Sequence, residues 1–401
     1  MLRRLLPRVE KPGRYLGCEV NAVFKDPAEV DLRVALAFPD VYEIAFSHIG
    51  LKILYEILNG LPKVWAERVY APWFDLESEL RAAHEPLFAL ESKDPLTRFD
   101  LIGFSLQHEL GATNILMMLE LGGLALTSAE RKEGDPLVIA GGPNTANPEP
   151  LHAFFDAFVL GEGEEAIAEI ANAMLAAKAA GLTRRETLLR LAQIEGVYVP
   201  SFYAKDPNGR LAPIEPGIPA HPKRRIVSDL DTASFTTRPL VPTVEPVHDR
   251  YAVEIQRGCT RGCRFCQSGF LYRPVRQRSP ETILRLARQG LQSSGQETLG
   301  LLSLSASDYA PLLPVAKALF AEHGQARVSL QLPSLRVETL GTELAQELNQ
   351  ERKTGFTLAP EAATERLRRA INKGNTEADL MKGLEAAFAN GWRHVKLYFM
   401  I

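Results

Sequence analysis

Cysteine is scarce in this chain, which has four in 401 residues. So few cysteines cannot form the disulfide framework of a small secreted protein. No apolar run approaches the roughly 20 residues that a membrane-spanning helix needs. The formal net charge is -3, which excludes a global polycation that would grip nucleic acid. Residues 1–14 are Arg-rich but broken by proline, so they are expected to form an N-terminal arm and no signal peptide.

The cysteines that are present gather in one place. Cys259, Cys263 and Cys266 have the spacing C-x3-C-x2-C, and Cys18 lies far away in sequence. Three thiolates on one short loop can bind three irons of a [4Fe-4S] cluster and leave the fourth iron open. The loop follows an apolar strand at 251–255 and precedes an expected helix over about 280–290. The spacing therefore predicts a metal centre with a free coordination position.

A zinc site is the alternative interpretation of clustered cysteines. Zinc takes four tetrahedral ligands, and structural zinc sites usually pair two C-x2-C hooks. No second hook exists in this sequence, so the iron-sulfur interpretation is preferred. Cys18 is then expected to be a small, partly buried hydrophobic residue.

The cysteine segment is also strongly basic. Between residues 255 and 280 there is no acidic residue, and six arginines occur: Arg257, Arg261, Arg264, Arg273, Arg276 and Arg278. Such a field lowers thiolate pKa values and favours an anionic ligand. A solvated basic loop and an RNA-binding surface are the alternatives. An oxygen-labile cluster needs a reducing compartment, so a cytoplasmic location is expected.

The first half of the chain alternates strand and helix patterns. Strands are expected at 31–38, 64–71, 100–105, 136–140 and 153–160, with helices near 48–58, 76–87, 112–124 and 164–177. This alternation predicts an α/β, Rossmann-like, doubly wound parallel sheet with helices on both faces. Ligands of such sheets bind beyond the carboxyl ends of the strands.

A connecting region follows this predicted domain. It should contain a helix over 182–194, a hairpin over 196–214 with a type I′ turn at Asn208-Gly209, and a proline-rich linker over 213–246. Apolar residues are expected to anchor the linker: Ile226, Val227, Leu230, Phe235 and Leu240.

The strand and helix alternation resumes after the cysteine loop. Strands are expected at 298–303, 327–332, 354–358 and 394–400, with helices near 312–322, 340–349, 363–371 and 377–390. Together with 251–255, these strands predict an incomplete parallel barrel with functional residues at strand carboxyl ends. The fifth strand closes the sequence and would leave an unpaired apolar edge. We therefore expect a truncated barrel that a missing C-terminal part or a second chain completes.

The run from 257 to 266, with Phe265 before the last cysteine, resembles the opening of a radical SAM enzyme. The resemblance implies a (βα)6 partial barrel and a [4Fe-4S] cluster whose open iron binds S-adenosylmethionine. It implies reductive cleavage of that cofactor to a 5′-deoxyadenosyl radical, with the protein supplying orientation and exclusion of water. It also implies an electron donor such as flavodoxin or ferredoxin. Phe265 would contact the adenine.

The same resemblance nominates further residues for S-adenosylmethionine. Ser303, Ser305 and Asp308 follow the second barrel strand, where the family binds the methionine amino group, although the usual Gly-Gly-Glu is absent. Arg336 would bind the methionyl carboxylate in a bidentate manner, with a surface salt bridge as the alternative. Glu361 would accept hydrogen bonds from ribose hydroxyls or the ammonium, with helix capping as the alternative.

Three segments of the first half, 100–105, 138–143 and 160–166, resemble the cobalamin-binding domain that precedes the barrel in one large radical SAM subfamily. The resemblance implies cobalamin contacts from His48, Gly50, Ser105, Gly141, Gly142, Gly161 and Gly163. Tight strand-helix turns are the alternative for the glycines. A dinucleotide fingerprint is disfavoured, because that motif follows a first strand and three glutamates here would repel a pyrophosphate.

The histidine departs from the pattern of that subfamily. Domains that ligate cobalt through histidine carry D-x-H-x-x-G, whereas residues 47–50 are Ser-His-Ile-Gly, with His48 one residue too close to Gly50. Many members of the group lack the ligand. A vestigial domain without cobalamin is therefore the alternative.

The resulting domains are an arm (1–30), a cobalamin-binding-type domain (31–180), a hairpin and linker (181–248) and a radical SAM barrel (249–401). The resemblance implies an enzyme that transfers a methyl group through cobalamin to an unknown substrate, with RNA among the candidates. One alternative is radical chemistry of another type with a vestigial N-terminal domain. The other is a truncated, non-catalytic iron-sulfur-binding protein.

Overall fold

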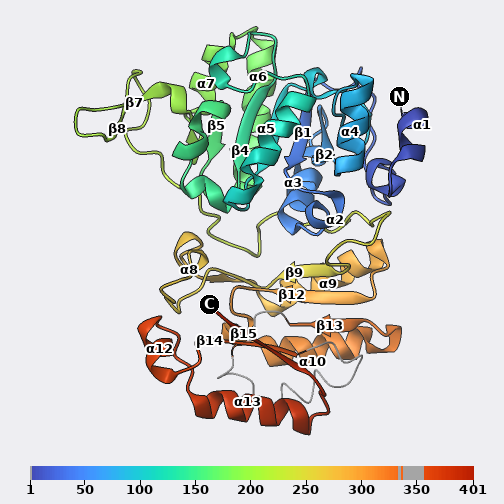
Figure 1. Ribbon diagram of the computed structural model, residues 1–401, viewed down its shortest axis with the longest axis vertical. Helices are drawn as coiled ribbons and strands as arrows, with labels where there is room; N and C mark the ends of the chain where they lie inside the picture. The colour runs from blue at the N-terminus through green and yellow to red at the C-terminus, as the bar shows by residue number, and fades with distance from the viewer. Residues whose placement is uncertain (1, 333–335, 337–355) are drawn as a thin grey trace. The chain divides into compact units, whose positions relative to one another are not determined.

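The computed structural model describes residues 2–332, 336 and 356–401. It divides into two compact units, which are considered separately (Figure 1). The N-terminal unit comprises Met1–Val227 with Leu240–His248, and the C-terminal unit comprises Ser228–Pro239 with Asp249–Ile401. No helix in the described ranges is long and apolar enough to cross a membrane.

A six-stranded sheet forms the centre of the N-terminal unit. Its strands are β1 (Leu32–Phe38), β2 (Val64–Tyr70), β3 (Leu101–Ser105), β4 (Leu137–Gly141), β5 (Ala157–Val159) and β6 (Val197–Tyr198). The order is β2-β1-β3-β4-β5-β6, in which β6 alone runs antiparallel to its neighbour. The order reverses at β1, so the predicted doubly wound α/β sheet is confirmed.

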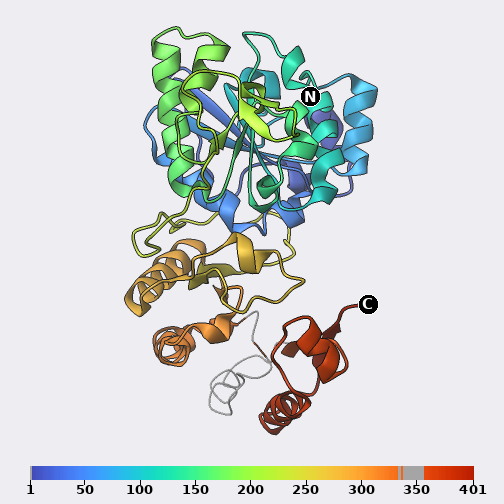
Figure 2. The same cartoon turned by 90° about the vertical axis from the view of Figure 1, so that its left-hand side faces the viewer.

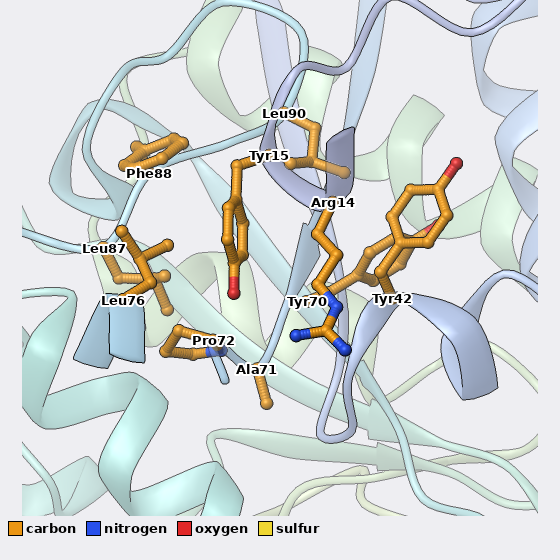
Figure 3. A pocket seen from close by; sticks show the side chains of 10 residues that line it. All are labelled: Arg14, Tyr15, Tyr42, Tyr70, Ala71, Pro72, Leu76, Leu87, Phe88 and Leu90. Atoms are coloured by element: carbon orange, nitrogen blue, oxygen red, sulfur yellow. The ribbon is translucent and has the colours of Figure 1, made fainter. Parts of the chain in front are cut away.

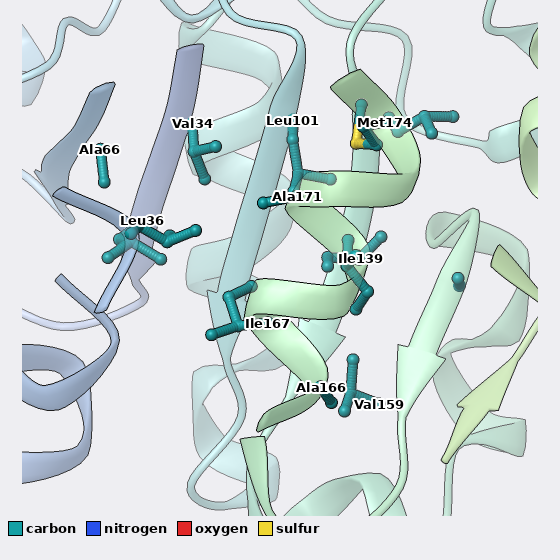
Figure 4. Packing of buried hydrophobic residues seen from close by; sticks show 14 of the residues in the cluster. Val34, Leu36, Ala66, Leu101, Ile139, Val159, Ala166, Ile167, Ala171 and Met174 are labelled. Atoms are coloured by element: carbon teal, nitrogen blue, oxygen red, sulfur yellow. The ribbon is translucent and has the colours of Figure 1, made fainter. Parts of the chain in front are cut away.

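Helices cover both faces of this sheet, as Figure 2 shows. One face carries α3 (Ile49–Gly60), α6 (Gly163–Ala179) and α7 (Arg184–Leu191), and the other carries α4 (Phe74–Ala83) and α5 (Ala112–Leu121). Side chains alternate along β1, because Val34 and Leu36 pack in one core and Ala35 in the other. Figure 4 shows Ile167, Ala171 and Met174 of α6 lying over the first of these cores.

Two local predictions in this unit are wrong. The strand expected at 153–160 covers only Ala157–Val159, and the preceding Glu149–Phe154 is a 3-10 helix with proline in its first turn. Proline fixes φ near helical values and lacks an N–H for a ladder bond. The hairpin consists of β7 (Tyr203–Lys205) and β8 (Leu211–Pro213), whereas Val197–Tyr198 pairs with β5 instead.

The hairpin turn is also not type I′. That turn needs positive φ at both central residues, but of the two only Gly209 has one. The Asp206 carboxylate accepts from the backbone N–H groups of Asn208 and Arg210 at 2.9 and 2.8 Å. Because this side chain organises the turn, the Asn-Gly signal is overridden.

The proline-rich segment belongs to both units. Residues 228–239 lie in the C-terminal unit and 240–248 in the N-terminal unit. Val227, Leu230 and Leu240 are buried as the sequence predicts, whereas Ile226 is exposed. The Tyr251 hydroxyl donates to the Thr236 carbonyl at 2.8 Å, which ties the segment to the first strand of the C-terminal unit.

Strands and helices alternate again in the C-terminal unit. Its strands are β9 (Tyr251–Glu254), β12 (Thr298–Leu302), β13 (Ser329–Gln331), β14 (Phe356–Glu361) and β15 (Val395–Phe399). Its main helices are α9 (Pro280–Ser294), α10 (Leu312–His323), α12 (Glu365–Ala370) and α13 (Glu377–Ala389). Two parallel sheets result, β13-β12-β9 and β14-β15. The helix expected at 340–349 lies outside the described residues.

Candidate active site

The three clustered cysteines lie on a loop closed by a short antiparallel pair, β10 (Gln256–Arg257) and β11 (Arg276–Gln277). All three are free thiols; Cys263 is buried and the other two are half-buried. The backbone N–H of Cys266 donates to the Cys263 carbonyl at 3.1 Å, which makes a tight turn. This loop therefore presents reduced sulfur ligands on one short, folded segment.

Glycine shapes the cysteine loop at two positions. Gly258 has φ +88°, and a Cβ there would come within 2.5 Å of the Tyr272 carbonyl oxygen. Gly262 has φ +65°, in the left-handed region that favours glycine. A side chain at Gly258 would push the two ends of the loop apart.

The donor set of three free thiols fits an iron-sulfur cluster with one open iron. Across residues 2–332, 336 and 356–401, no three His, Cys, Asp or Glu side chains converge closely enough to hold a single metal ion. Thiolates around one zinc lie about 3.8 Å apart, as tetrahedral bonds of about 2.3 Å require. Cluster thiolates bind three separate irons and need not converge on one point.

The arginines of the segment are engaged by the protein itself. Arg257 pairs with Glu254, Arg261 with Asp308, and Arg264 donates to the Ala370 carbonyl. Arg276 and Arg278 are buried and donate to backbone carbonyls, and the Arg273 guanidinium lies 4.7 Å from the Phe270 ring centroid. These contacts account for the arginines as structural residues of the loop.

Residues after β12 meet the cysteine loop through Asp308. Its carboxylate accepts two hydrogen bonds from Arg261, of which Nε to Oδ2 is 2.8 Å. This guanidinium lowers the pKa of Asp308, with further contributions from Ser305 and Arg336. Asp308 is thus already paired with a cation from the cysteine loop.

Ser303 has a restricted hydrogen-bonding role. Its Oγ accepts from Gln256 Nε2 at 3.5 Å and from the Ser305 N–H at 3.1 Å. Gln277 Nε2 in turn donates to Gln256 Oε1 at 2.6 Å, which fixes the orientation of that amide. A hydroxyl has two lone pairs and one proton, so these contacts leave the Ser303 proton available for donation to a ligand. It suits a carboxylate better than the predicted ammonium.

The other predicted cofactor residues lie after β12, on the cysteine loop and at the end of β14. The backbone N–H of Arg336 donates to Ser307 Oγ at 3.3 Å, so Arg336 joins the residues after β12. Phe265 is exposed on the cysteine loop. Glu361 ends β14 with φ +69°, and its carboxylate lies 3.6 Å from Lys373 Nζ. A left-handed backbone in a non-glycine residue is a strained conformation that recurs at functional sites.

A turn after α12 contacts the cysteine loop, and the sequence did not predict it. Asn372 Nδ2 donates to the carbonyls of Arg261 and Gly262 at 3.3 and 2.8 Å. The N–H of Arg264 donates to the Ile371 carbonyl at 3.0 Å. The cysteine loop therefore has Asp308 as one neighbour and Asn372 as another. Of the sequence features, only the Asn-Lys-Gly after a short helix pointed to this turn.

In the N-terminal unit, His48 is the N-cap of α3. Its Nδ1 accepts from the Leu51 N–H at 3.1 Å. Removal from water lowers the pKa of His48 to about 4. A hydrogen bond with Gln107 acts in the opposite direction and raises this pKa, whereas the nearby charge of Lys52 lowers it further by a smaller amount. The neutral ring then carries its proton on Nε2, so neither nitrogen offers a lone pair to a metal. These contacts favour capping over cobalt ligation.

The glycines at the carboxyl edge of the sheet fall into two groups. A Cβ at Gly142 or Gly161 would lie 2.5 or 2.2 Å from the backbone carbonyl of Leu106 or Arg225, so packing alone requires glycine at these two positions. A Cβ at Gly50 would lie 2.8 Å from His48 Cε1, the end of the capping side chain. A Cβ at Gly141 or Gly163 would make only ordinary contacts, at 3.9 and 3.5 Å. Ser105 is buried at the end of β3. Gly141 and Gly163 thus have no packing explanation, which fits the approach of a ligand.

A small hollow lies beyond the end of β2 in the same unit. Figure 3 shows Arg14 and Tyr15 pointing into it beside Tyr70, Leu76 and Phe88. It has space for about one water molecule, so it is too small for a cofactor.

Two family models match this chain. A model described as the N-terminal part of radical SAM proteins matches residues 50–200, and the radical SAM superfamily model matches residues 253–401. An uncharacterized protein of Methanocaldococcus jannaschii is 27% identical over 372 residues, which are 92% of this chain and 69% of that protein.

Two solved structures share the fold at low sequence identity. The radical S-adenosylmethionine methyltransferase TsrM from Kitasatospora setae, with cobalamin and a [4Fe-4S] cluster bound, has a TM-score of 0.58 at 13% identity and covers 91% of this chain and 66% of its own. The cobalamin-dependent S-adenosylmethionine radical enzyme OxsB, with aqua-cobalamin and S-adenosylmethionine bound, has a TM-score of 0.55 at 12% identity. The chain spans 49% of the length of OxsB.

Proposed function

Because the chain belongs to the radical SAM superfamily and is an enzyme of that class, we propose that Cys259, Cys263 and Cys266 bind a [4Fe-4S] cluster and present its open iron to S-adenosylmethionine. The observation that carries this proposal is the set of three free thiols on one loop, held between Asp308 after β12 and Asn372 in the turn after α12. When bound and reduced, the cluster would supply the electron that cleaves the cofactor.

Each of the surrounding residues has its own proposed role in binding S-adenosylmethionine. Ser303 donates to the methionyl carboxylate, since its lone pairs are already used. Arg336 binds the same carboxylate, and Glu361 accepts from the ammonium or the ribose hydroxyls. Phe265 lies against the adenine. Asp308 and Ser305 orient the loop through Arg261 instead of touching the cofactor.

Anaerobic reconstitution tests the cluster and the catalysis together. Iron and sulfide analysis with Mössbauer spectroscopy should find four irons per chain, and reduction with S-adenosylmethionine should yield 5′-deoxyadenosine. Cys263→Ala should lose both. Cys18→Ala is the matched control, because Cys18 is exposed, contrary to the predicted partial burial, and belongs to the other unit. Cleavage retained by Cys263→Ala would remove the assignment.

For the second half of the proposal, we infer that the N-terminal unit, which contains the domain predicted at residues 31–180, binds cobalamin for methyl transfer. The doubly wound sheet, the fold shared with TsrM and OxsB, and the unexplained Gly141 and Gly163 support it. The contacts of His48 do not fit cobalt ligation, so the binding mode proposed has no histidine ligand. Bound cobalamin would supply a carrier for the methyl group.

Cobalamin binding separates this function from the alternatives. Retention of cobalamin through gel filtration, read from its visible spectrum, should be stoichiometric. Cleavage of S-adenosylmethionine without cobalamin retention would favour another radical reaction. Iron without cleavage would favour a non-catalytic protein. A flavodoxin or ferredoxin is the proposed reductant, and RNA stays a candidate substrate.

A further inference from the structure

The turn after α12 is hydrogen-bonded to the cysteine loop through one side chain, Asn372. Asn372 Nδ2 donates to the Gly262 carbonyl at 2.8 Å and to the Arg261 carbonyl at 3.3 Å. Both carbonyls lie between the first and second cysteines of the loop. A primary amide has two N–H donors, so it can satisfy two acceptors at once.

Asparagine stands here at a backbone position where glycine is more common. The Asn372 N–H donates to the Arg369 carbonyl at 3.0 Å, and the Lys373 N–H donates to the Arg368 carbonyl at 2.8 Å. These bonds define a Schellman turn, in which the residue at position 372 is left-handed and usually glycine. Asn372 has φ +57°, which asparagine tolerates at some cost. The side chain is present despite this cost, and the loop carbonyls are its partners.

The same turn connects the loop to the end of β14. Lys373 Nζ lies 3.6 Å from the Glu361 carboxylate, and the Ile371 carbonyl accepts from the Arg264 N–H. Any shift of the turn therefore reaches the cysteine loop on one side and the strand end on the other.

We propose that Asn372 is a positioning residue for the cluster. Its amide fixes the backbone between Cys259 and Cys263, so that the thiolates keep the spacing that the cluster and S-adenosylmethionine require. The role rests on the proposed function. This role requires no contact between Asn372 and the cofactor.

Two substitutions separate the effect of the two hydrogen bonds from Asn372 to the loop carbonyls, here called the clasp, from the effect of the strained left-handed backbone. Asn372→Gly keeps the left-handed turn and removes both hydrogen bonds. Asn372→Asp keeps the size but places a carboxylate against two carbonyl oxygens. Asn21→Gly is the matched control, since Asn21 has φ +70° and lies in the N-terminal unit. Asn372→Gly should leave the melting temperature of the protein close to that of the wild type.

The readouts are chosen to detect positioning. Asn372→Gly should raise the KM for S-adenosylmethionine by up to about tenfold, since the two lost hydrogen bonds act on the cofactor only through the loop. It should also change the electron paramagnetic resonance of the reduced cluster. Asn372→Asp should be worse. Asn21→Gly should change neither. Wild-type spectra and KM in both Asn372 variants would overturn the proposal.

A measurement without the cluster keeps this test apart from the proposed function. In the cluster-free full chain, amide hydrogen exchange at 260–264 should be faster in Asn372→Gly than in the wild type and in Asn21→Gly. Equal exchange would overturn the clasp. Faster exchange in a protein that takes up no iron would support the clasp and count against the proposed function alone.

Discussion

Arg261 and Asp308 form a two-point ion pair that joins the cysteine loop to the residues after β12, with Nε 2.8 Å from Oδ2. The side chains are partly shielded, at 38% and 17% exposure. Sequence reasoning assigned Asp308 to the cofactor and Arg261 to a basic field. Their pairing makes both of them structural supports of the loop.

We predict that this pair stabilises the C-terminal unit. Asp308→Asn and Arg261→Gln should show a coupling free energy of about 1 kcal/mol in a double-mutant cycle, because two charge-assisted hydrogen bonds form in a half-buried setting. Urea unfolding of the cluster-free chain measures it. The control cycle uses Arg288 and Glu322, a similar pair of which Arg288 is 58% exposed. That pair should show a smaller coupling because solvent screens it, and equal couplings in the two cycles would refute the distinction.

His48 should act as a helix cap. His48→Ala removes the acceptor of the Leu51 N–H and should cost about 1 kcal/mol of stability, whereas His48→Asn should retain most of it. Cobalamin retention should be unaffected by His48→Asn, since no lone pair of His48 is free. A loss of bound cobalamin with unchanged stability would restore the ligand role.

The depressed pKa of His48 also predicts a pH dependence. The folded pKa is about 4 and the ordinary value is 6.5, so the unfolded chain binds the proton more readily. Above pH 6.5 His48 contributes nothing to this linkage. As the pH falls from 6.5 towards 4, the free energy of unfolding should decrease, and below 4 this contribution should level off. His48→Asn should have a shallower slope over that window in denaturant titrations.

Much of the fold follows from local sequence signals, and the failures have local causes. The parallel strands β1 to β4 were predicted because short apolar runs mark them, and helices such as α3 and α6 because helical apolar periodicity marks them. The segment near 153 failed because prolines 148 and 150 start a 3-10 helix. The residues of β6 fall within the first strand expected for the hairpin, but the pairing of so short a strand with β5 could not be predicted.

The site could be predicted only where its functional residues lie close together in the sequence. The three cysteines share one loop, so spacing alone reveals them. The partners of Arg261 and Gly262 lie 47 and 110 residues away, and no local pattern records such contacts. Similarly, the sequence does not show that the backbone of Arg225 packs against Gly161. This close contact leaves no room for a side chain at Gly161.

A buried charge cluster lies in the N-terminal unit. Arg68 donates to Glu19 at 2.6 Å and to Glu91 at 2.7 Å, and all three side chains are almost fully buried. Arg68→Met should cost about 3–5 kcal/mol, because it leaves two carboxylates buried without a cation. Circular dichroism during urea unfolding measures this.

The exposed Arg81 supplies the control, since it pairs with Glu77 and Glu120 at the surface. Arg81→Met should cost less than about 1 kcal/mol. In Arg68→Met the carboxylates should bind protons in the folded state, so the deficit should shrink as the pH is lowered towards 5. A deficit independent of pH would contradict the buried-charge explanation.

The two groups of glycines predict opposite outcomes for one substitution. Gly161→Ala should destabilise the protein by about 1–3 kcal/mol, because φ is +99° and the new Cβ would lie 2.2 Å from the Arg225 carbonyl. Gly141→Ala should change stability by less than about 0.5 kcal/mol, since its Cβ would lie 3.9 Å from Val159. If cobalamin approaches the end of β4, the same methyl group should weaken its binding by about tenfold or more, as a steric cost of about 1.4 kcal/mol implies. Titration of cobalamin into both variants, followed by its visible spectrum, decides the matter. Unchanged affinity in Gly141→Ala would place the ligand elsewhere on the sheet edge, and Gly163→Ala would then be the next position to examine.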